Sequence, residues 1–280
     1  MPLVTLPQAT IDYRELGPRD SAHPPVLFVH GALVDHRLWS GVASRLAERG
    51  FRCLLPDWPL GSHIIPVDDR SVLSPAGVAE LIQEFMVALD LHDVTLVGND
   101  TGGGICQFLI DAHPDRIGRL VLTNCDAFDK FPPFPFNAIF ALMHSPLTIR
   151  PMMVSMRARV LRHSPLGFGL LADNLDPALT ASWLAPCRTD SRIAGDFAAL
   201  ARAIGRTDLT RVAPRLHRFT KHVTVVWGMR DRCFTPALGR RLTALFPAGT
   251  LVTVDDAATF VPLDDPRAVS DAIAHVGAGA

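Results

Sequence analysis

The amino-acid sequence comprises 280 residues, of which 48% are hydrophobic, and its 27 basic and 28 acidic side chains leave a formal net charge of −1. A chain of this length predicts one large domain, or one domain that carries an inserted segment. A net charge near zero gives no electrostatic reason to expect a nucleic acid or an anionic membrane as a partner.

No targeting or membrane-spanning segment is evident in the sequence. The first 15 residues are too polar for a signal peptide, and no apolar run approaches the roughly 20 residues that a membrane span needs. The five cysteines are widely spaced and form no CxxC pair, which is typical of free thiols in a reducing compartment. We therefore expect a cytoplasmic protein without a metal or an organic cofactor. The sequence leaves the oligomeric state open.

Apolar stretches bounded by turn residues predict alternating strands and helices in the first half of the chain. We expect a β-hairpin over 4–14, strands over 25–29, 51–56, 94–97 and 117–123, and helices over 38–47, 75–89 and from 103 onward. Strands that alternate with helices predict a mostly parallel sheet covered by helices on both faces.

The alternation stops after Cys125. The run Phe131-Pro132-Pro133-Phe134-Pro135-Phe136 cannot form a central strand, because proline lacks the backbone donor. Residues 128–216 predict helices without a strand, and this stretch is long for a loop. Strand patterns return over 222–227 and 250–254, followed by a helix pattern over 266–275. We expect a core domain of residues 1–127 and 217–280, and an inserted helical cap of residues 128–216.

The most specific motif is Gly98-Asn99-Asp100-Thr101-Gly102, which lies between the strand over 94–97 and a helix-like stretch. A small-x-nucleophile-x-small sequence at a strand-to-helix junction is typical of a nucleophile elbow. The turn is sharp and strained, so a Cβ at either small position would clash. The central residue of the motif is usually Ser, whereas here it is Asp100.

These features together resemble the α/β-hydrolase fold. The matching segments, in the order of the family, are His30-Gly31, Pro56-Asp57-Trp58-Pro59, the elbow, Trp227-Gly228-Met229-Arg230-Asp231 and Phe260-Val261-Pro262-Leu263-Asp264-Asp265-Pro266. An Asp in the elbow is similar to the branch that contains haloalkane dehalogenases, fluoroacetate dehalogenases and epoxide hydrolases. The string Gly-Asn-Asp-Thr-Gly-Gly also resembles poorly characterised bacterial members of the fold.

The resemblance implies a role for each matching residue. In that branch an elbow carboxylate displaces a halide or opens an epoxide, and a histidine then activates water against the covalent ester. Asp100 would be this nucleophile, and Asp231 would be the acid that orients the histidine. The backbone amides of Ala32 and Thr101 would form the oxyanion hole.

The sequence departs from this pattern at three points. Thr259 stands where the family places the histidine, and Thr has no group that titrates near neutral pH. Thr101 stands where haloalkane dehalogenases commonly place a halide-binding Trp and fluoroacetate dehalogenases an Arg. Epoxide hydrolases protonate the epoxide with cap tyrosines, whereas the only tyrosine here is Tyr13 in the N-terminal hairpin.

Three hypotheses follow for the function. In the first, Asp100 is a general acid/base beside the oxyanion hole, in an addition, cyclisation, elimination or isomerisation. The oxyanion amides would then be available to an enolate or phenolate, and family members without hydrolysis occur in natural-product pathways. In the second, Asp100 is the nucleophile of a hydrolase whose base has moved, with the candidates His36, His63, His144 and His163. In the third, the protein binds a ligand without catalysis, as hormone receptors of this fold do.

We favour the first hypothesis, because Thr259 replaces the base and a carboxylate in an apolar pocket, near a second carboxylate, can have a raised pKa. The cap is rich in Phe and Met, which predicts a pocket for a hydrophobic small molecule, aromatic ones included. The cap residues concerned are Phe134, Phe136, Phe140, Met143, Met152, Met153, Met156 and Phe168. Further candidates for lining the pocket are His30, His36, Trp58, Asn99, Asn124, Trp183, Thr259 and Phe260.

Overall fold

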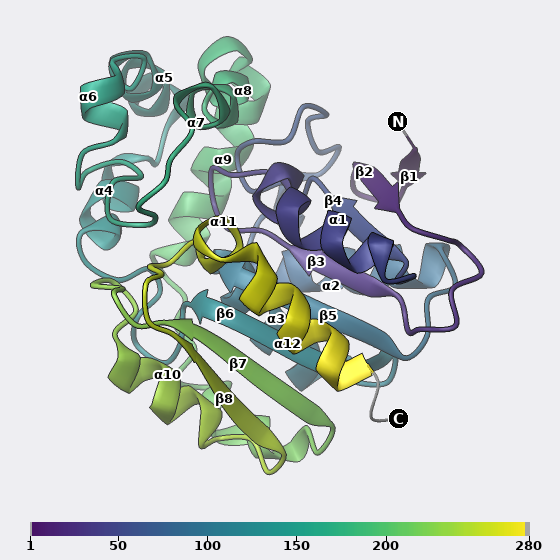
Figure 1. Ribbon diagram of the computed structural model, residues 1–280. Helices are drawn as coiled ribbons and strands as arrows, with labels where there is room; N and C mark the ends of the chain where they lie inside the picture. Colours follow the sequence, from purple (N-terminus) through teal and green to yellow (C-terminus); the bar gives the residue numbers. More distant parts are fainter. Residues whose placement is uncertain (1, 278–280) are drawn as a thin grey trace.

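The computed structural model describes residues 2–277, and the centre of the fold in that range is one sheet of eight strands (Figure 1). The strands are β1 (Leu3–Thr5), β2 (Thr10–Leu16), β3 (Val26–Val29), β4 (Cys53–Pro56), β5 (Val94–Asp100), β6 (Ile117–Cys125), β7 (His222–Gly228) and β8 (Gly249–Val254). Each strand pattern of the sequence corresponds to one of these strands.

The order of the strands in the sheet is β1-β2-β4-β3-β5-β6-β7-β8. β1 and β2 form the predicted hairpin, with Val4 opposite Ile11, and β2 pairs antiparallel with β4. All pairs from β4 to β8 are parallel, since the connections between these strands cross over through helical segments. The predicted mostly parallel α/β fold is confirmed. Every residue of β3 and β4 is buried, as expected for a parallel sheet covered on both faces.

Twelve α-helices and three short 3-10 helices accompany the sheet in the described range. The helices are α1 (Ser40–Glu48), α2 (Pro75–Ala88), α3 (Thr101–Ala112), α4 (Phe136–Leu142), α5 (Pro146–Ser155), α6 (Arg159–Arg162), α7 (Pro177–Trp183), α8 (Ala185–Thr189), α9 (Ser191–Ile204), α10 (Pro236–Thr243), α11 (Val261–Asp264) and α12 (Pro266–Gly277). The 3-10 helices are η1 (His36–Trp39), η2 (Arg70–Val72) and η3 (Ala213–Arg218). The helix predicted over 38–47 thus begins two residues earlier, as η1, where Asp35 accepts a hydrogen bond from the amide of Arg37.

Helices cover both faces of the sheet. α1 packs against α12 on one face, and α2 packs against α3 on the other (Figure 1). The apolar sides of these helices and the buried strands form one hydrophobic core. Burial of this apolar surface is the dominant favourable contribution to folding.

The segment of residues 128–216 contains α4 to α9 and no strand in its described residues, as its sequence predicts. Figure 1 shows α4 to α8 gathered beyond the carboxyl end of β6, and α9 leads back towards the core. Several hydrogen bonds join this segment to the rest of the chain, two of which lie near the site. The Phe260 amide donates to the Leu171 carbonyl oxygen (2.6 Å), and the Ser62 hydroxyl donates to the Trp183 carbonyl oxygen (2.8 Å). We call this segment the cap.

In the described residues, no helix is long and apolar enough to cross a membrane. All five cysteines are free and buried.

Candidate active site

The candidate site centres on the turn between β5 and α3. Asp100 is the last residue of β5 and the N-cap of α3, with φ 53° and ψ −130°. Such a backbone costs an L-residue about 1–3 kcal/mol, and small neighbours make the turn possible. A Cβ at Gly98 would lie 2.7 Å from the Cys106 sulfur, and a Cβ at Gly102 would collide with the His30 carbonyl oxygen. The turn therefore has the geometry of a strained elbow, with a carboxyl group at its tip.

Two backbone amides lie beside the Asp100 carboxyl group. The Thr101 amide belongs to the first turn of α3 and the Ala32 amide to the loop after β3, and both lie towards this carboxyl group and lower its pKa. The loop can approach because residue 31 is glycine: a Cβ at Gly31 would overlap the Asp100 carboxylate. The role of these two amides as an oxyanion hole stays a prediction.

The surroundings of Asp100 raise its pKa to about 7. Burial is the largest cause, and the negative charge of Asp231 adds to it. The amides of Thr101 and Ala32 lower the pKa without offsetting the burial. The side chain is enclosed by protein but keeps part of its surface open to a cavity. A carboxyl group with a pKa near 7 can both accept and donate a proton at neutral pH.

Asp231, directly after β7 and Met229-Arg230, accepts four hydrogen bonds. Its Oδ1 accepts from the amides of Cys233 (2.7 Å) and Phe234 (2.9 Å). Its Oδ2 accepts from Asn124 Nδ2 and from the Thr259 hydroxyl, each at 2.8 Å. Burial raises the pKa of Asp231 to about 6, although these hydrogen bonds favour the charged form. The Thr259 hydroxyl thus makes the contact with the acid that the resemblance assigns to a histidine.

Two asparagines fix the positions of Asp231 and Thr259 relative to the elbow. Asn124, near the end of β6, also accepts from the Gly228 amide through Oδ1 (2.6 Å). Asn99, directly before Asp100, donates through Nδ2 to the Thr259 carbonyl oxygen (2.8 Å) and to the Thr123 hydroxyl (2.7 Å). Both side chains are buried, and their contacts are structural.

Sequence reasoning missed Asp126, which directly follows β6. Its backbone amide donates to the Asp100 carbonyl oxygen (3.3 Å), and its side chain is fully buried. Neither carboxyl oxygen has a partner at hydrogen-bonding geometry among the described residues, although the Thr101 hydroxyl lies towards it and lowers its pKa. Burial, followed by the charge of Asp100, raises the pKa of Asp126 well above its usual value. Its position at the carboxyl end of a central strand was the signal that could have found it.

His30, directly after β3, cannot act as a base in this arrangement. Its Nδ1 lies 2.9 Å from the Gly31 carbonyl oxygen, and its Nε2 accepts the Trp58 amide at 2.9 Å. The carbonyl group fixes the proton on Nδ1, and the amide occupies the lone pair of Nε2. Burial lowers the pKa of His30, so the ring is a neutral link between two loops.

The four histidines considered as relocated bases are engaged elsewhere. Their ring partners are Asp57 for His36 (2.8 Å), Asp196 for His63 (3.4 Å), the Ala141 carbonyl oxygen for His144 (3.1 Å) and the Thr180 hydroxyl for His163 (2.9 Å). Within residues 2–275, no histidine lines the cavity beside Asp100.

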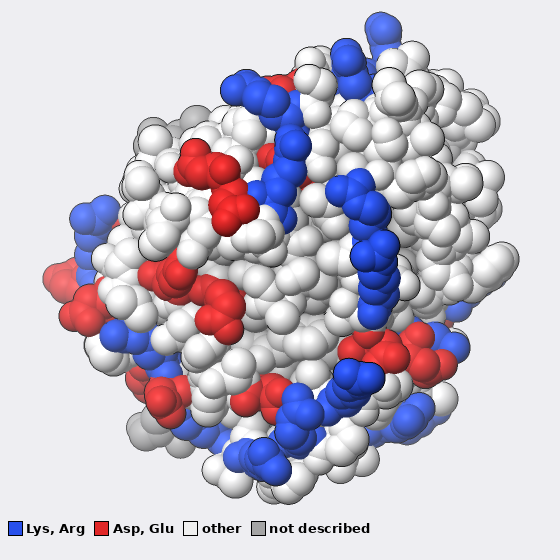
Figure 2. Space-filling model, turned by 180° about the vertical axis from the view of Figure 1, so that it is seen from behind, with Lys and Arg blue, Asp and Glu red and all other residues white. Residues whose placement is uncertain are grey.

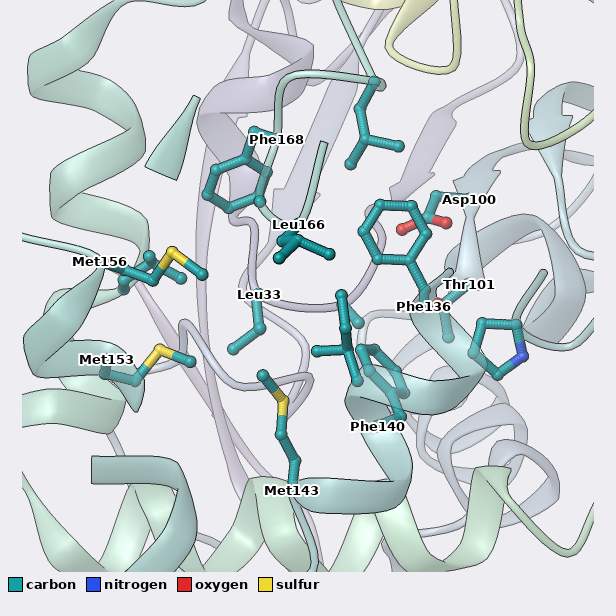
Figure 3. A pocket seen from close by; sticks show the side chains of 16 residues that line it. Leu33, Asp100, Thr101, Phe136, Phe140, Met143, Met153, Met156, Leu166 and Phe168 are labelled. Atoms are coloured by element: carbon teal, nitrogen blue, oxygen red, sulfur yellow. The ribbon is translucent and has the colours of Figure 1, made fainter. Parts of the chain in front are cut away.

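The cavity lies between Asp100 and the cap and has a volume of about 70 Å³. Figure 3 shows the Asp100 carboxyl group at one side of it and apolar side chains around the rest. The apolar wall includes Leu33, Phe136, Phe140, Met143, Met153, Met156, Leu166 and Phe168, and Asp100 and Thr101 are the polar side chains that the described residues contribute. An apolar cavity of about 150 Å³ holds a benzene molecule, so this cavity is smaller than one aromatic ring needs.

The eight further side chains considered as lining the cavity do not form its wall. The tryptophans are turned away by their own hydrogen bonds: Trp58 Nε1 donates to the Phe28 carbonyl oxygen, and Trp183 Nε1 donates to Asp35, each at 3.0 Å. Trp183 and Phe260 pack edge-on against each other, one layer behind Phe168. The remaining five are the residues with the structural contacts described above: His30, His36, Asn99, Asn124 and Thr259.

One group of described side chains has the composition of a metal site, namely Asp35, His36 and Asp57, whose candidate ligand atoms lie within 4.8 Å of one another. The Asp35 carboxylate already accepts from Arg37 and from Trp183. The Asp57 carboxylate accepts from the amide and the ring of His36. Because cationic and neutral donors already satisfy both carboxylates, the arrangement favours a structural network over a metal.

Two hydrolases illustrate the proteins to which this chain is similar over most of its length. Haloalkane dehalogenase 2 of Mycobacterium tuberculosis (strain ATCC 25618 / H37Rv) is 26% identical over 272 residues, which cover 89% of this chain and 86% of that protein. The 2-hydroxy-6-oxononadienedioate/2-hydroxy-6-oxononatrienedioate hydrolase 1 of Dechloromonas aromatica is 26% identical over 227 residues, 78% of this chain and 74% of that protein.

Solved structures share the fold. The enol-lactonase from Burkholderia xenovorans LB400 superposes with a TM-score of 0.76 at 19% identity, over 98% of this chain and 99% of that one. An esterase from Exiguobacterium antarcticum gives a TM-score of 0.73 at 19% identity, over 95% of both chains. The sequence profile of the alpha/beta hydrolase fold matches residues 24–266. The chain therefore belongs to the alpha/beta hydrolase fold family of enzymes and is related to its haloalkane dehalogenases.

Proposed function

We propose that this enzyme transfers protons on a small hydrophobic substrate, with Asp100 as acid and base, and that it does not hydrolyse its substrate. The reaction types that fit are addition, cyclisation, elimination and isomerisation. A place in natural-product biosynthesis and a cytoplasmic location belong to the same proposal.

The observation that carries the proposal is the hydrogen bond between Thr259 and Asp231 (2.8 Å), in a site whose cavity no described histidine lines. Hydrolysis through a covalent ester needs a base that activates water. A threonine hydroxyl cannot take that proton near neutral pH. The carboxyl group of Asp100, by contrast, has a pKa of about 7 and faces the cavity.

Proton transfer by Asp100 uses the elbow differently from hydrolysis. The amides of Ala32 and Thr101 orient the carboxyl group and favour its charged form. A proton moves from an acidic C–H or O–H group of the substrate to a carboxylate oxygen of Asp100, and the same oxygen returns it to another substrate atom. The cycle consumes neither water nor an oxidant. Its efficiency follows from the match between the pKa of Asp100 and the working pH.

The cavity supports a small, largely apolar substrate. Its walls offer one carboxyl group and one threonine against a surface of Phe, Met and Leu side chains. Such a wall binds by removing apolar area from water, and its few polar groups set the orientation. A substrate with an aromatic ring would require the cap to move outward, because about 70 Å³ does not hold one.

Isotope exchange tests the proposal without knowledge of the natural substrate. A panel of small apolar ketones is incubated with the enzyme in deuterated water, and mass spectrometry follows deuterium incorporation. We expect exchange at the carbon next to the carbonyl group, and its loss in Asp100→Asn. Asp255→Asn, an exposed carboxylate on the core, is the matched control. Exchange that is equal in wild type and Asp100→Asn would contradict the proposal.

A hydrolase that uses Asp100 as nucleophile is the second candidate. The strained elbow and the two amides on the carboxyl group favour it, as does the relation to haloalkane dehalogenases. It requires a base from His36, His63, His144 or His163 after a rearrangement of the cap or its adjoining loop. Repeated turnover of a haloalkane or an epoxide by the wild type would favour this candidate.

A ligand-binding protein without catalysis is the third candidate. The apolar cavity favours it. Tight binding of a ligand that is recovered unchanged, with equal affinity in Asp100→Asn, would support this candidate over both catalytic ones.

A further inference from the structure

We propose that the cap docks on an anionic membrane surface through an apolar and basic face, and that the substrate enters the cavity from this side. The docking face comprises the exposed side chains of residues 134–166, on and around α4, α5 and α6. The argument for docking uses only the surface of the cap. The path of the substrate, by contrast, rests on the proposed function.

Exposed apolar side chains are concentrated on this part of the chain. Seven of the ten exposed large apolar residues in the described range fall between 134 and 166. They are Phe134, Leu142, Leu147, Val154, Val160, Leu161 and Leu166, with Leu147 86% and Val160 82% exposed. Leu147 and Val154 are seven residues apart on α5 and therefore share one face of that helix. Single exposed apolar residues are normal, whereas a gathered set marks a docking surface.

The charges on the same segment are of one sign. Residues 130–172 contain five basic residues and no Asp or Glu. Arg150, Arg157 and Arg159 are exposed, and none of them forms an ion pair with an acidic residue in the described range. Arg162 is buried and donates to the carbonyl oxygens of Met156 and Arg157, which holds α6 against the end of α5. Figure 2 shows the cap at the upper right, with basic side chains at its rim and no acidic ones on that part of the surface.

The overall net charge does not reveal that basic and acidic residues lie on different parts of the chain. The chain carries a net charge of −1, from which we expected no membrane partner, but the acidic residues lie outside residues 130–172. A basic rim with protruding Leu, Val and Phe side chains fits anionic lipid: the arginines meet the headgroups, and the apolar side chains enter the acyl boundary. The described helices cannot span a bilayer, so the cap would lie on the surface.

Charge favours a lipid surface over a second copy of this chain. In a twofold dimer the same patch meets itself, so Arg157 and Arg159 would face the arginines of the other copy without an acidic partner. An anionic membrane instead neutralises them. The occupant that the chemistry of the docking face fits is therefore an anionic lipid surface.

The docking face is continuous with the cavity of the active site. Leu166 is 60% exposed and also lines the cavity beside Asp100. Phe136 and Met156 are half-buried and line it too. A hydrophobic substrate that partitions into the membrane could pass between these side chains without crossing water.

Vesicle sedimentation tests the proposal. Purified full-length protein is mixed with vesicles of phosphatidylcholine alone, or of phosphatidylcholine with phosphatidylserine. We expect binding to the anionic vesicles that weakens with salt and little binding to the neutral ones. Arg157→Ser with Arg159→Ser should weaken it on the order of thirtyfold, and Val160→Ser by roughly tenfold.

Matched variants on the core serve as controls. Arg218→Ser with Arg240→Ser makes the same change of charge at exposed positions outside the cap, and Val87→Ser removes an exposed valine from α2. Both should bind as the wild type does. Absence of vesicle binding would overturn the proposal, as would equal losses in cap and core variants. A dimer in analytical ultracentrifugation that Val160→Ser dissociates and Val87→Ser preserves would assign the face to self-association. The assay needs no substrate, so its outcome is independent of the chemistry of Asp100.

Discussion

The Thr259 hydroxyl donates a hydrogen bond to the Asp231 carboxylate across 2.8 Å. This contact fixes the Asp231 side chain and satisfies one of its carboxylate oxygens. It does not provide an imidazole ring for Asp231 to orient. The site therefore has an elbow, two amides and an acid, without the group that would activate water in a hydrolase.

Replacing Thr259 by His tests whether only the base is missing. We expect Thr259→His to gain slow hydrolysis of small haloalkanes or esters, because Asp231 Oδ2 would accept from the new ring. The side chain is fully buried, so overpacking should cost about 1–3 kcal/mol of stability. Halide release and ester cleavage measure the gain. The control Thr259→Val should lose about 1 kcal/mol and gain no activity. A variant with His that folds, places its ring on Asp231 and remains inert would contradict the role assigned to this position.

The raised pKa values of Asp100 and Asp231 predict an unusual pH dependence of stability. Folding raises these pKa values from 3.8 to about 7 and about 6, so between pH 4 and 7 the folded state binds more protons than the unfolded state. The free energy of unfolding should therefore fall as the pH rises from about 4 to about 7, by a few kcal/mol, and these groups should add no slope above that range. Urea unfolding across this range measures it. Asp100→Asn should flatten the slope and Asp255→Asn should not; equal slopes in both variants would show that Asp100 titrates normally.

Asp126 should destabilise the protein at neutral pH. Its carboxyl group is fully buried, has no partner at hydrogen-bonding geometry in the described range, and has a pKa raised well above its usual value. The unfolded chain loses that proton readily at pH 7, which favours unfolding. Asp126→Asn keeps the shape and removes the titration, so we expect a gain of about 1–3 kcal/mol at pH 7 that shrinks towards pH 4. Chemical denaturation measures it, and a loss of stability at pH 7 would mean that the carboxyl group has a stabilising partner.

Gly31 controls the position of the Asp100 carboxyl group. A Cβ there would overlap the carboxylate, so Gly31→Ala should displace Asp100 from the amides and reduce deuterium exchange on the order of a hundredfold. Gly205→Ala, whose Cβ would be 3.6 Å from its nearest neighbour, is the control and should exchange at the wild-type rate. Wild-type exchange in a folded Gly31→Ala would mean that the amides do not position the reacting carboxyl group.

The fold could be predicted from the sequence because its signals are local. Apolar runs of strand length, such as 26–29 and 94–97, alternate with helical patterns, and the strained elbow requires the small residues Gly98 and Gly102. The resemblance assigned Asp231 to the position of the acid and Thr259 to the position of the histidine, and the structure joins the two side chains by a hydrogen bond. The Phe and Met residues of the cap likewise predicted an apolar cavity.

The orientation of loop side chains could not be predicted. Trp58 and Trp183 were candidates for lining the cavity, but their rings donate hydrogen bonds to Phe28 and Asp35 and do not form its wall. The amides of Ala32 and Thr101 were predicted to lie at the elbow, but the close approach of Gly31 to the Asp100 carboxyl group is known only from the structure. The position of Asp126 after a central strand could have marked it as a candidate, but its full burial is known only from the structure.

The central claim is that Asp100 moves protons and does not drive hydrolysis, and labelled water tests it most directly. The enzyme is incubated in water that carries heavy oxygen and deuterium, with small ketones, haloalkanes, epoxides and esters, and the products are weighed by mass spectrometry. We predict deuterium in a recovered ketone, dependent on Asp100, and no heavy oxygen in an alcohol or acid product beyond what forms without enzyme. Heavy oxygen in an alcohol or acid product over many turnovers, lost in Asp100→Asn, would contradict the account.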